Sequence, residues 1–174
     1  MTVMTNTVLA ELITSAYRTG PYELPGGGIL DEYFDPYQLT GDPHRLRTVA
    51  AALADLLPAG TEAVAGPALA AVPLVAAVAL HTGLPAAYLR PASKHHGTHQ
   101  QTEGADLNGR RTVLLDDTAR TGANLLLAAS TLRETGALVA GAVCILDRDA
   151  GAAALLADHG LSLAALLHDP GRAR

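Results

Sequence analysis

The sequence is poor in aromatic residues and contains only one cysteine. The first scarcity limits the composition of the core, and the second limits the covalent cross-links that the chain can form. Aromatic residues make up 3% of the 174 residues while 49% are hydrophobic, so the core is built mainly from Ala, Leu and Val. The single cysteine, Cys144, excludes an internal disulfide framework. Its apolar neighbours in "AGAVCILD" predict a buried thiol in a reducing compartment.

Positive charge is also scarce. Twelve Lys and Arg residues against 17 Asp and Glu give a net charge of -5, which argues against non-specific binding to nucleic acid or to an anionic membrane. Residues 63–89 carry no Lys, Arg, Asp or Glu, but their unbroken part, "ALAAVPLVAAVAL", has the length of a buried core helix rather than a membrane span. No basic residue precedes the first apolar stretch, so we expect a cytoplasmic protein without a secretory signal.

From residue 62 onwards, apolar strands alternate with helices. The patterns predict strands at 62–66, 86–90, 111–116, 138–146 and 161–167, and helices at 68–82, 122–135 and 149–158. Two earlier helices are expected at 8–17 and 42–57, the second with Asp42 as N-cap and Pro43 at its first position. This alternation favours an α/β fold with a central parallel sheet covered by helices on both faces. We expect one domain over 1–174, with an α/β core at 41–168 and a small N-terminal appendage at 1–40 that has a short strand near 33–35.

Ligands of such sheets bind beyond the carboxyl ends of the strands, and one strand end carries two adjacent acids. In "RTVLLDDTARTGANLLL", Asp116 and Asp117 precede a small polar turn that opens a helix. The amides of the turn suit a phosphate, with Thr118, Thr121 and Asn124 as further donors and Gly122 allowing close approach. Acids beside a phosphate seat suit a sugar phosphate; a solvated acidic turn is the alternative. The chain has neither a G-x-x-x-x-G-K-[ST] motif nor a G-x-G-x-x-G after a strand.

Two other strand ends carry cationic side chains. The segment "LRPASKHHGTHQQTEG" gathers Arg90, Lys94, His95, His96 and His99, and a flexible cationic loop of this kind closes on a polyanion such as pyrophosphate. A histidine metal site and a plain solvated loop are the alternatives. In "ILDRDAG", Arg148 follows a buried strand, where it either pairs with a planar carboxylate of a ligand or forms a salt bridge with Asp147 or Asp149.

Together these segments resemble the type I phosphoribosyltransferases, and specifically the orotate phosphoribosyltransferase branch. "VLLDDTARTGANL" is similar to the family's phosphoribosyl diphosphate signature and "LRPASKHHGTHQQTEGADLNGRR" to its catalytic loop. "VAGPALAAVPLVAAVAL" resembles the pyrophosphate-loop segment, and "LDRDAGA" resembles the element whose Arg holds the carboxylate of orotate. The resemblance covers roughly residues 8–168 and implies the family's fold, in which the N-terminal appendage forms a hood.

The resemblance implies a role for each matched position. Asp116 and Asp117 bind the ribose hydroxyls directly or through Mg²⁺, and Arg148 selects a carboxylated pyrimidine. Arg90, Lys94 and His96 bind the leaving pyrophosphate, reaching into the neighbouring subunit of a homodimer. The remaining contacts are the pyrophosphate-loop residues Ala70 and Ala71 and the 5′-phosphate cradle, which consists of Thr118, Ala119, Arg120, Thr121, Gly122, Ala123 and Asn124.

The chain also departs from the family pattern. Pro91 stands where Lys often follows the loop Arg, and Ala71 replaces a common Gly. Pro25, Gly26 and Gly28 occupy positions where Lys, Ser and Arg are common, whereas Arg120 adds a cation to the phosphate turn. Three interpretations follow: a working phosphoribosyltransferase that uses orotate or a related carboxylated heterocycle, a non-catalytic sensor of phosphoribosyl diphosphate, and an unrelated parallel-sheet protein with an acidic metal pocket.

Overall fold

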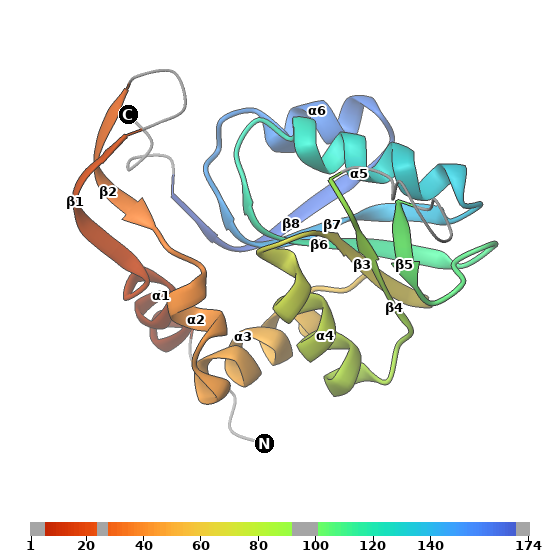
Figure 1. Ribbon diagram of the computed structural model, residues 1–174, viewed down its shortest axis with the longest axis horizontal. Coiled ribbons are helices and arrows are strands. Elements are labelled where there is room, and N and C mark those ends of the chain that lie inside the picture. Colours follow the sequence, from red (N-terminus) through yellow and green to blue (C-terminus); the bar gives the residue numbers. More distant parts are fainter. Residues whose placement is uncertain (1–5, 24–27, 92–100, 170–174) are drawn as a thin grey trace.

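The structure is a computed structural model that describes residues 6–23, 28–91 and 101–169. Figure 1 shows its helices and strands. The helices are α1 (Asn6–Thr14), α2 (Tyr37–Thr40), α3 (Pro43–Asp55), α4 (Ala71–Thr82), α5 (Ala123–Glu134) and α6 (Ala152–Asp158). The strands are β1 (Tyr17–Glu23), β2 (Ile29–Phe34), β3 (Ala63–Pro67), β4 (Ala86–Leu89), β5 (Thr102–Gly104), β6 (Arg111–Ala119), β7 (Leu138–Asp147) and β8 (Ser162–His168).

A six-stranded sheet in the order β5-β4-β3-β6-β7-β8 forms the centre of the molecule. All its neighbouring pairs are parallel except β4 and β5, which are antiparallel. The chain moves outward from β3 to β4 and then returns to the opposite side of β3 with β6. The carboxyl ends of β3 and β6 therefore meet at a topological switch point, where ligands of α/β proteins bind.

Helices cover both faces of the sheet, as the alternating pattern predicts. Helices α3 and α4 lie on one face, and α5 and α6 lie on the other (Figure 1). Each layer has its own buried apolar cluster, built around Leu53, Leu74 and Val78 on the first face and around Leu125 and Leu132 on the second. The predicted mixed α/β fold with a mostly parallel sheet is confirmed.

Two local sequence signals act as predicted. The Asp42 carboxylate accepts hydrogen bonds from the backbone N–H groups of His44 at 2.9 Å and Arg45 at 3.0 Å, so it caps α3. Cys144 is fully buried on β7, and burial raises the pKa of its thiol. The cysteine is thus part of the core.

The N-terminal segment differs from the prediction. The first helix ends at Thr14, and a strand that was not predicted, β1, begins at Tyr17, the last residue of the expected helix. β1 pairs antiparallel with β2 to form a separate two-stranded hairpin, with a register shift between Thr19 and Tyr22 at the Gly20–Pro21 step. Gly and Pro are poor strand formers, and most of β1 is not buried, so the hairpin has no strong apolar alternation. The sequence pattern therefore shows only its second strand.

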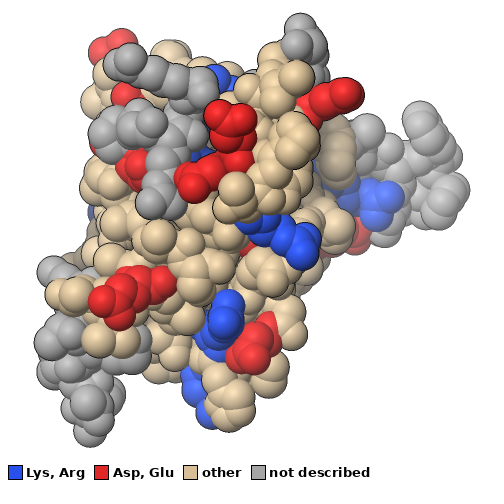
Figure 2. All heavy atoms as spheres, turned by 90° about the vertical axis from the view of Figure 1, so that its left-hand side faces the viewer, with Lys and Arg blue, Asp and Glu red and all other residues tan. Residues whose placement is uncertain are grey.

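The short strand β5 was also expected to be loop. It has three residues, and it is found only through its pairing with β4, in which Tyr88 lies opposite Glu103. Within the described residues, no helix is both long enough and apolar enough to cross a membrane. The face on the hairpin side carries acidic and basic side chains interspersed among uncharged residues, and its described part shows no continuous basic surface (Figure 2).

Candidate active site

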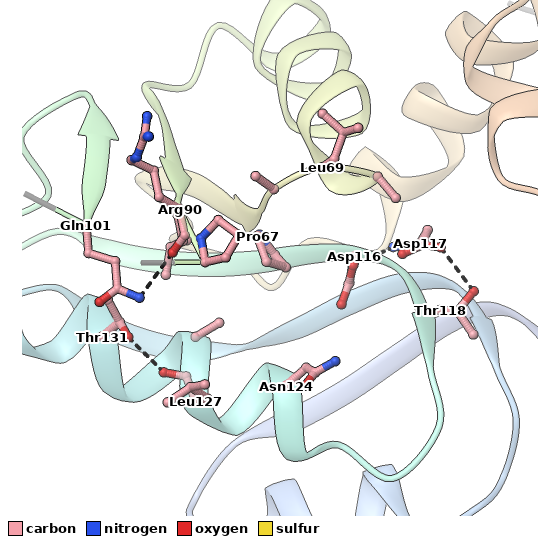
Figure 3. Close-up of a pocket in the computed structure, with 15 residues that line it drawn as sticks. Pro67, Leu69, Arg90, Gln101, Asp116, Asp117, Thr118, Asn124, Leu127 and Thr131 are labelled. Carbon is pink, nitrogen blue, oxygen red and sulfur yellow. Dashed lines mark hydrogen bonds between the residues drawn. The ribbon is translucent and has the colours of Figure 1, made fainter. Parts of the chain in front are cut away.

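A cleft of about 490 Å³ opens at the switch point between β3 and β6. Figure 3 shows the residues around it. The segment after β3, the end of β4, the acidic end of β6 and the first turns of α5 form its walls. The lining residues are Pro67, Ala68, Leu69, Ala70, Leu89, Arg90, Pro91, Gln101, Asp116, Asp117, Thr118, Asn124, Leu127, Ala128 and Thr131.

The acidic pair lies where β6 leaves the core of the sheet. Asp116 is 9% exposed, and its side chain points into the cleft opposite Asn124 (Figure 3). Its Oδ1 accepts a hydrogen bond from the backbone N–H of Asp117 at 2.9 Å. The Thr118 hydroxyl donates to Asp117 Oδ2 at 3.4 Å. The two carboxyl groups thus present oxygen acceptors beside a hydroxyl and an amide, a set that suits sugar hydroxyls.

Electrostatics make this pair unusual. Burial and the neighbouring charge of Asp117 raise the pKa of Asp116 to about 8, because both effects disfavour a second negative charge at this place. In the free protein Asp116 is therefore largely protonated near neutral pH. A cation or a group of hydroxyl donors would stabilise the ionised form, so the site is suited to a ligand that supplies one.

The turn after the acidic pair divides into cleft residues and packing residues. Thr118 and Asn124 line the cleft, whereas Ala119 is buried and its carbonyl accepts a hydrogen bond from the Arg148 backbone N–H at 2.8 Å. Gly122 has φ +82, and a Cβ there would lie 3.0 Å from Ala152 Cα. Glycine is therefore required at this position both by its left-handed conformation and by its packing against α6.

Three other residues of the predicted phosphate cradle, Arg120, Thr121 and Ala123, are exposed and do not line the cleft. The two residues predicted for the pyrophosphate loop differ from each other in their exposure to the cleft. Ala70 lines the cleft, whereas Ala71 is fully buried at the start of α4. The peptide bond between Ala68 and Leu69 in this wall is cis.

Arg90 stands at the rim of the cleft, next to Pro91. Its backbone N–H donates to the Gln101 carbonyl at 2.8 Å, and the Gln101 side chain donates back to the Arg90 carbonyl at 3.1 Å. In Figure 3 the Arg90 side chain points away from Asp116. The predicted loop residues Lys94, His95, His96 and His99, together with the departures at Pro25 and Gly26, lie outside the described residues.

Arg148 has other partners than the two acids considered from the sequence. Its Nη1 donates to the Tyr17 hydroxyl at 2.9 Å and lies 3.9 Å from Asp169 Oδ2. Its guanidinium carbon lies 5.3 Å from the centre of the Tyr17 ring. Arg148 does not line the cleft, but the hydrogen bond from its backbone N–H to the Ala119 carbonyl joins it to the turn after the acidic pair.

Sequence reasoning gave no individual role to several residues near the site, although Leu69 and Gln101 lie in segments that it considered. Leu69 and Leu127 are exposed apolar residues of the cleft, and Gln101 and Thr131 add polar groups. Burial and the charge of Asp117 raise the pKa of the Tyr33 phenol, which places this residue of β2 within electrostatic range of the acidic pair. Apart from the i, i+4 spacing of Leu127 and Thr131 on α5, no sequence signal distinguishes these positions.

Comparison with known proteins identifies the family. The sequence model of one protein family, the phosphoribosyl transferase domain, matches residues 38–159. The chain is 38% identical over 167 residues to an orotate phosphoribosyltransferase of Halobacterium salinarum, with 96% of this chain and 95% of that protein covered. The chain belongs to the phosphoribosyltransferase family, in its orotate phosphoribosyltransferase branch.

Further relatives agree with this assignment. An orotate phosphoribosyltransferase of Natronomonas pharaonis is 41% identical over 152 residues, covering 87% of each chain. Among solved structures, the Aeropyrum pernix orotate phosphoribosyltransferase has a TM-score of 0.74 at 30% identity over 95% of this chain and 93% of that one. The Mycobacterium tuberculosis orotate phosphoribosyltransferase has a TM-score of 0.81 at 26% identity over 94% and 95%. The resemblance inferred from the sequence is confirmed, and membership in this family excludes the unrelated parallel-sheet protein.

Proposed function

We propose that this phosphoribosyltransferase moves ribose 5-phosphate from phosphoribosyl diphosphate to orotate or a related carboxylated heterocycle, with release of pyrophosphate. The observation that carries the proposal is the acidic pair, Asp116 and Asp117, placed in the switch-point cleft beside Thr118 and Asn124. The curated relatives that match most of the chain are orotate phosphoribosyltransferases, which supports the choice of acceptor.

In this reaction the bond between ribose C1 and the pyrophosphate oxygen breaks, and a bond from C1 to a ring nitrogen of the acceptor forms as that nitrogen loses its proton. Positive charge builds on the ribose ring meanwhile. Asp116 and Asp117 accept hydrogen bonds from the ribose hydroxyls and hold the ring beside the phosphate turn. Thr118, Asn124 and the turn amides between them bind the 5′-phosphate.

The acidic pair also fits Mg²⁺. Carboxylate oxygens are preferred ligands of this ion, and the raised pKa of Asp116 indicates a place where a cation is favourable. Mg²⁺ would bind at Asp116 and Asp117, directly or through water, and neutralise charge on the leaving pyrophosphate. The protein holds the ribose hydroxyls next to the two acids.

Residues at the opposite wall bind the leaving group. Ala70 lines this wall at the start of α4, where the buried Ala71 forms part of the same turn. Arg90 stands at the rim of the cleft. Lys94 and His96 are further proposed pyrophosphate ligands, by resemblance alone. Because Arg90 points away from Asp116, it is suited to the site of a neighbouring copy, which supports a homodimer with shared sites (Figure 3). Light scattering of the eluted peak in size-exclusion chromatography tests the dimer, and a monomer would reject it.

One experiment separates this function from its alternative, a non-catalytic sensor of the same donor. The protein is incubated with phosphoribosyl diphosphate, Mg²⁺ and orotate, and both pyrophosphate and the nucleotide product are measured. Formation of both in equal amounts supports the enzyme. Tight donor binding by calorimetry without pyrophosphate release supports the sensor. We also propose a cytoplasmic location, which the single buried thiol favours and which cell fractionation tests.

A further inference from the structure

Three segments that are distant in the sequence meet at the Arg148 guanidinium. Tyr17 comes from the start of β1, Arg148 follows β7, and Asp169 follows β8. The separations are 131 residues between Tyr17 and Arg148 and 152 between Tyr17 and Asp169. The Asp169 backbone N–H donates to the Asp147 carbonyl at 2.9 Å, so the end of β8 is held beside the end of β7.

The Tyr17 hydroxyl lies between the two charged side chains. It accepts a hydrogen bond from Arg148 Nη1 at 2.9 Å and donates one to Asp169 Oδ2 at 2.5 Å. The direct distance from Nη1 to Asp169 Oδ2 is 3.9 Å, longer than a hydrogen bond. The aspartate is thus bound to the tyrosine rather than directly to the arginine.

This arrangement leaves part of the arginine unused. Nη1 is the nitrogen that makes both contacts, and among the described residues the other guanidinium nitrogens have no side-chain partner. The Arg148 side chain is only 11% exposed, and the Tyr17 ring against its guanidinium restricts its rotation. The ring in turn packs on Phe34, with centroids 5.5 Å apart. A planar cation with a free N–H edge in a restrained position is suited to bidentate binding of a carboxylate.

We infer that Tyr17 and Asp169 are positioning residues for acceptor specificity: the Tyr17 hydroxyl holds the Asp169 carboxylate away from Arg148, so that the guanidinium fork stays open for the carboxylate of the acceptor. The inference rests on the proposed function of Arg148. Without the hydroxyl, Asp169 is close enough to move onto the guanidinium and form an internal ion pair that competes with the acceptor. Asp169 in turn anchors the hydroxyl, because its Oδ2 accepts the hydrogen bond that Tyr17 donates.

The test compares Tyr17→Phe with Tyr17→Phe/Asp169→Asn, with Tyr22→Phe on the same strand as the matched control. We expect Tyr17→Phe to raise the KM for orotate about tenfold. The KM for phosphoribosyl diphosphate and the kcat should change little. The double variant should recover most of the loss, because an amide does not form an ion pair with Arg148. Tyr22→Phe should behave as the unmodified protein.

Two results would overturn the inference. One is an unchanged orotate KM in Tyr17→Phe. The other is a double variant that is at least as impaired as the single one, since damage to packing accumulates whereas relief of a competing ion pair does not. Thermal unfolding of each variant shows whether the chain is folded. If Tyr17→Phe is unfolded, Asp169→Asn alone is compared with Asp169→Ala. The Asn side chain still accepts a hydrogen bond from the Tyr17 hydroxyl, so Asp169→Asn should have the lower KM for orotate. Turnover of orotate by the unmodified protein is measured first, so failure of the proposed function is distinguished from failure of this inference.

Discussion

Replacing Asp116 by Asn should change the pH dependence of stability. Burial and the charge of Asp117 raise the pKa of Asp116 to about 8 in the folded protein, against 3.8 for the ordinary group. The folded state therefore binds a proton more tightly than the unfolded state does. The stability that this proton contributes is fully present below pH 3.8 and is lost as the pH rises through about 8.

The magnitude follows from these two pKa values. Each pH unit between them costs about 1.4 kcal/mol, so ionisation of Asp116 lowers the free energy of unfolding by roughly 3 kcal/mol between about pH 5.5 and about pH 8. Asn at this position does not titrate. The loss of stability over this interval should consequently be smaller in Asp116→Asn than in the unmodified protein by an amount of that order.

Urea unfolding at both pH values, in buffers that contain EDTA and no phosphate, measures the effect. Asp158→Asn is the control, because Asp158 is exposed at the end of α6 and its substitution should leave the pH dependence unchanged. Asp117→Asn should reduce the dependence in part, since it removes the neighbouring charge and leaves the burial. If the unmodified protein and Asp116→Asn lose equal stability between the two pH values, the carboxyl group is not held protonated and the electrostatic description of the site is wrong.

Three further outcomes are expected. Asp117→Asn should weaken binding of phosphoribosyl diphosphate about tenfold in calorimetry, because a ribose acceptor becomes half donor, and unchanged affinity would count against its assignment. Arg148→Ala should raise the KM for orotate by about tenfold or more while sparing donor affinity; equal use of uracil and orotate by the unmodified protein would give Arg148 another role. Gly122→Ala should lower the free energy of unfolding by roughly 2 kcal/mol more than the control Gly83→Ala. Gly83 has a similar φ, but no atom lies within 4 Å of a Cβ added there. Equal losses of stability in the two variants would reject the contact with Ala152.

The core of the fold and the acidic pair were predictable because their signals are local. An apolar run, two acids, a small turn with Gly122 and a helix define a strand, a turn and a helix in consecutive residues, and the structure has all three. The regular spacing of apolar strands likewise indicates a parallel sheet, whose carboxyl ends bring Asp116 and Ala70 to one cleft.

Features that depend on distant contacts were not predictable. The partners of Arg148 are Tyr17 and Asp169, whereas sequence proximity suggested Asp147 or Asp149. The strand β5 consists of three residues whose extended conformation is supported by pairing with β4 rather than by their own apolar pattern. In both cases the determining interaction joins segments that only the folded chain brings together.

The charges in the cleft bear on how the proposed reaction would neutralise its leaving group. Among the described lining residues, Arg90 is the only Lys or Arg, and its side chain points away from Asp116 (Figure 3). The other lining residues include two acids and two exposed leucines, Leu69 and Leu127. Pyrophosphate carries several negative charges, and one rim cation does not balance them. For the proposed reaction we therefore expect neutralisation to come from Mg²⁺ at the acidic pair, from cations of residues 92–100 or from a second subunit. We therefore expect activity to be more sensitive to Mg²⁺ concentration than it would be in a cleft with more cations, because few protein charges remain to replace the ion.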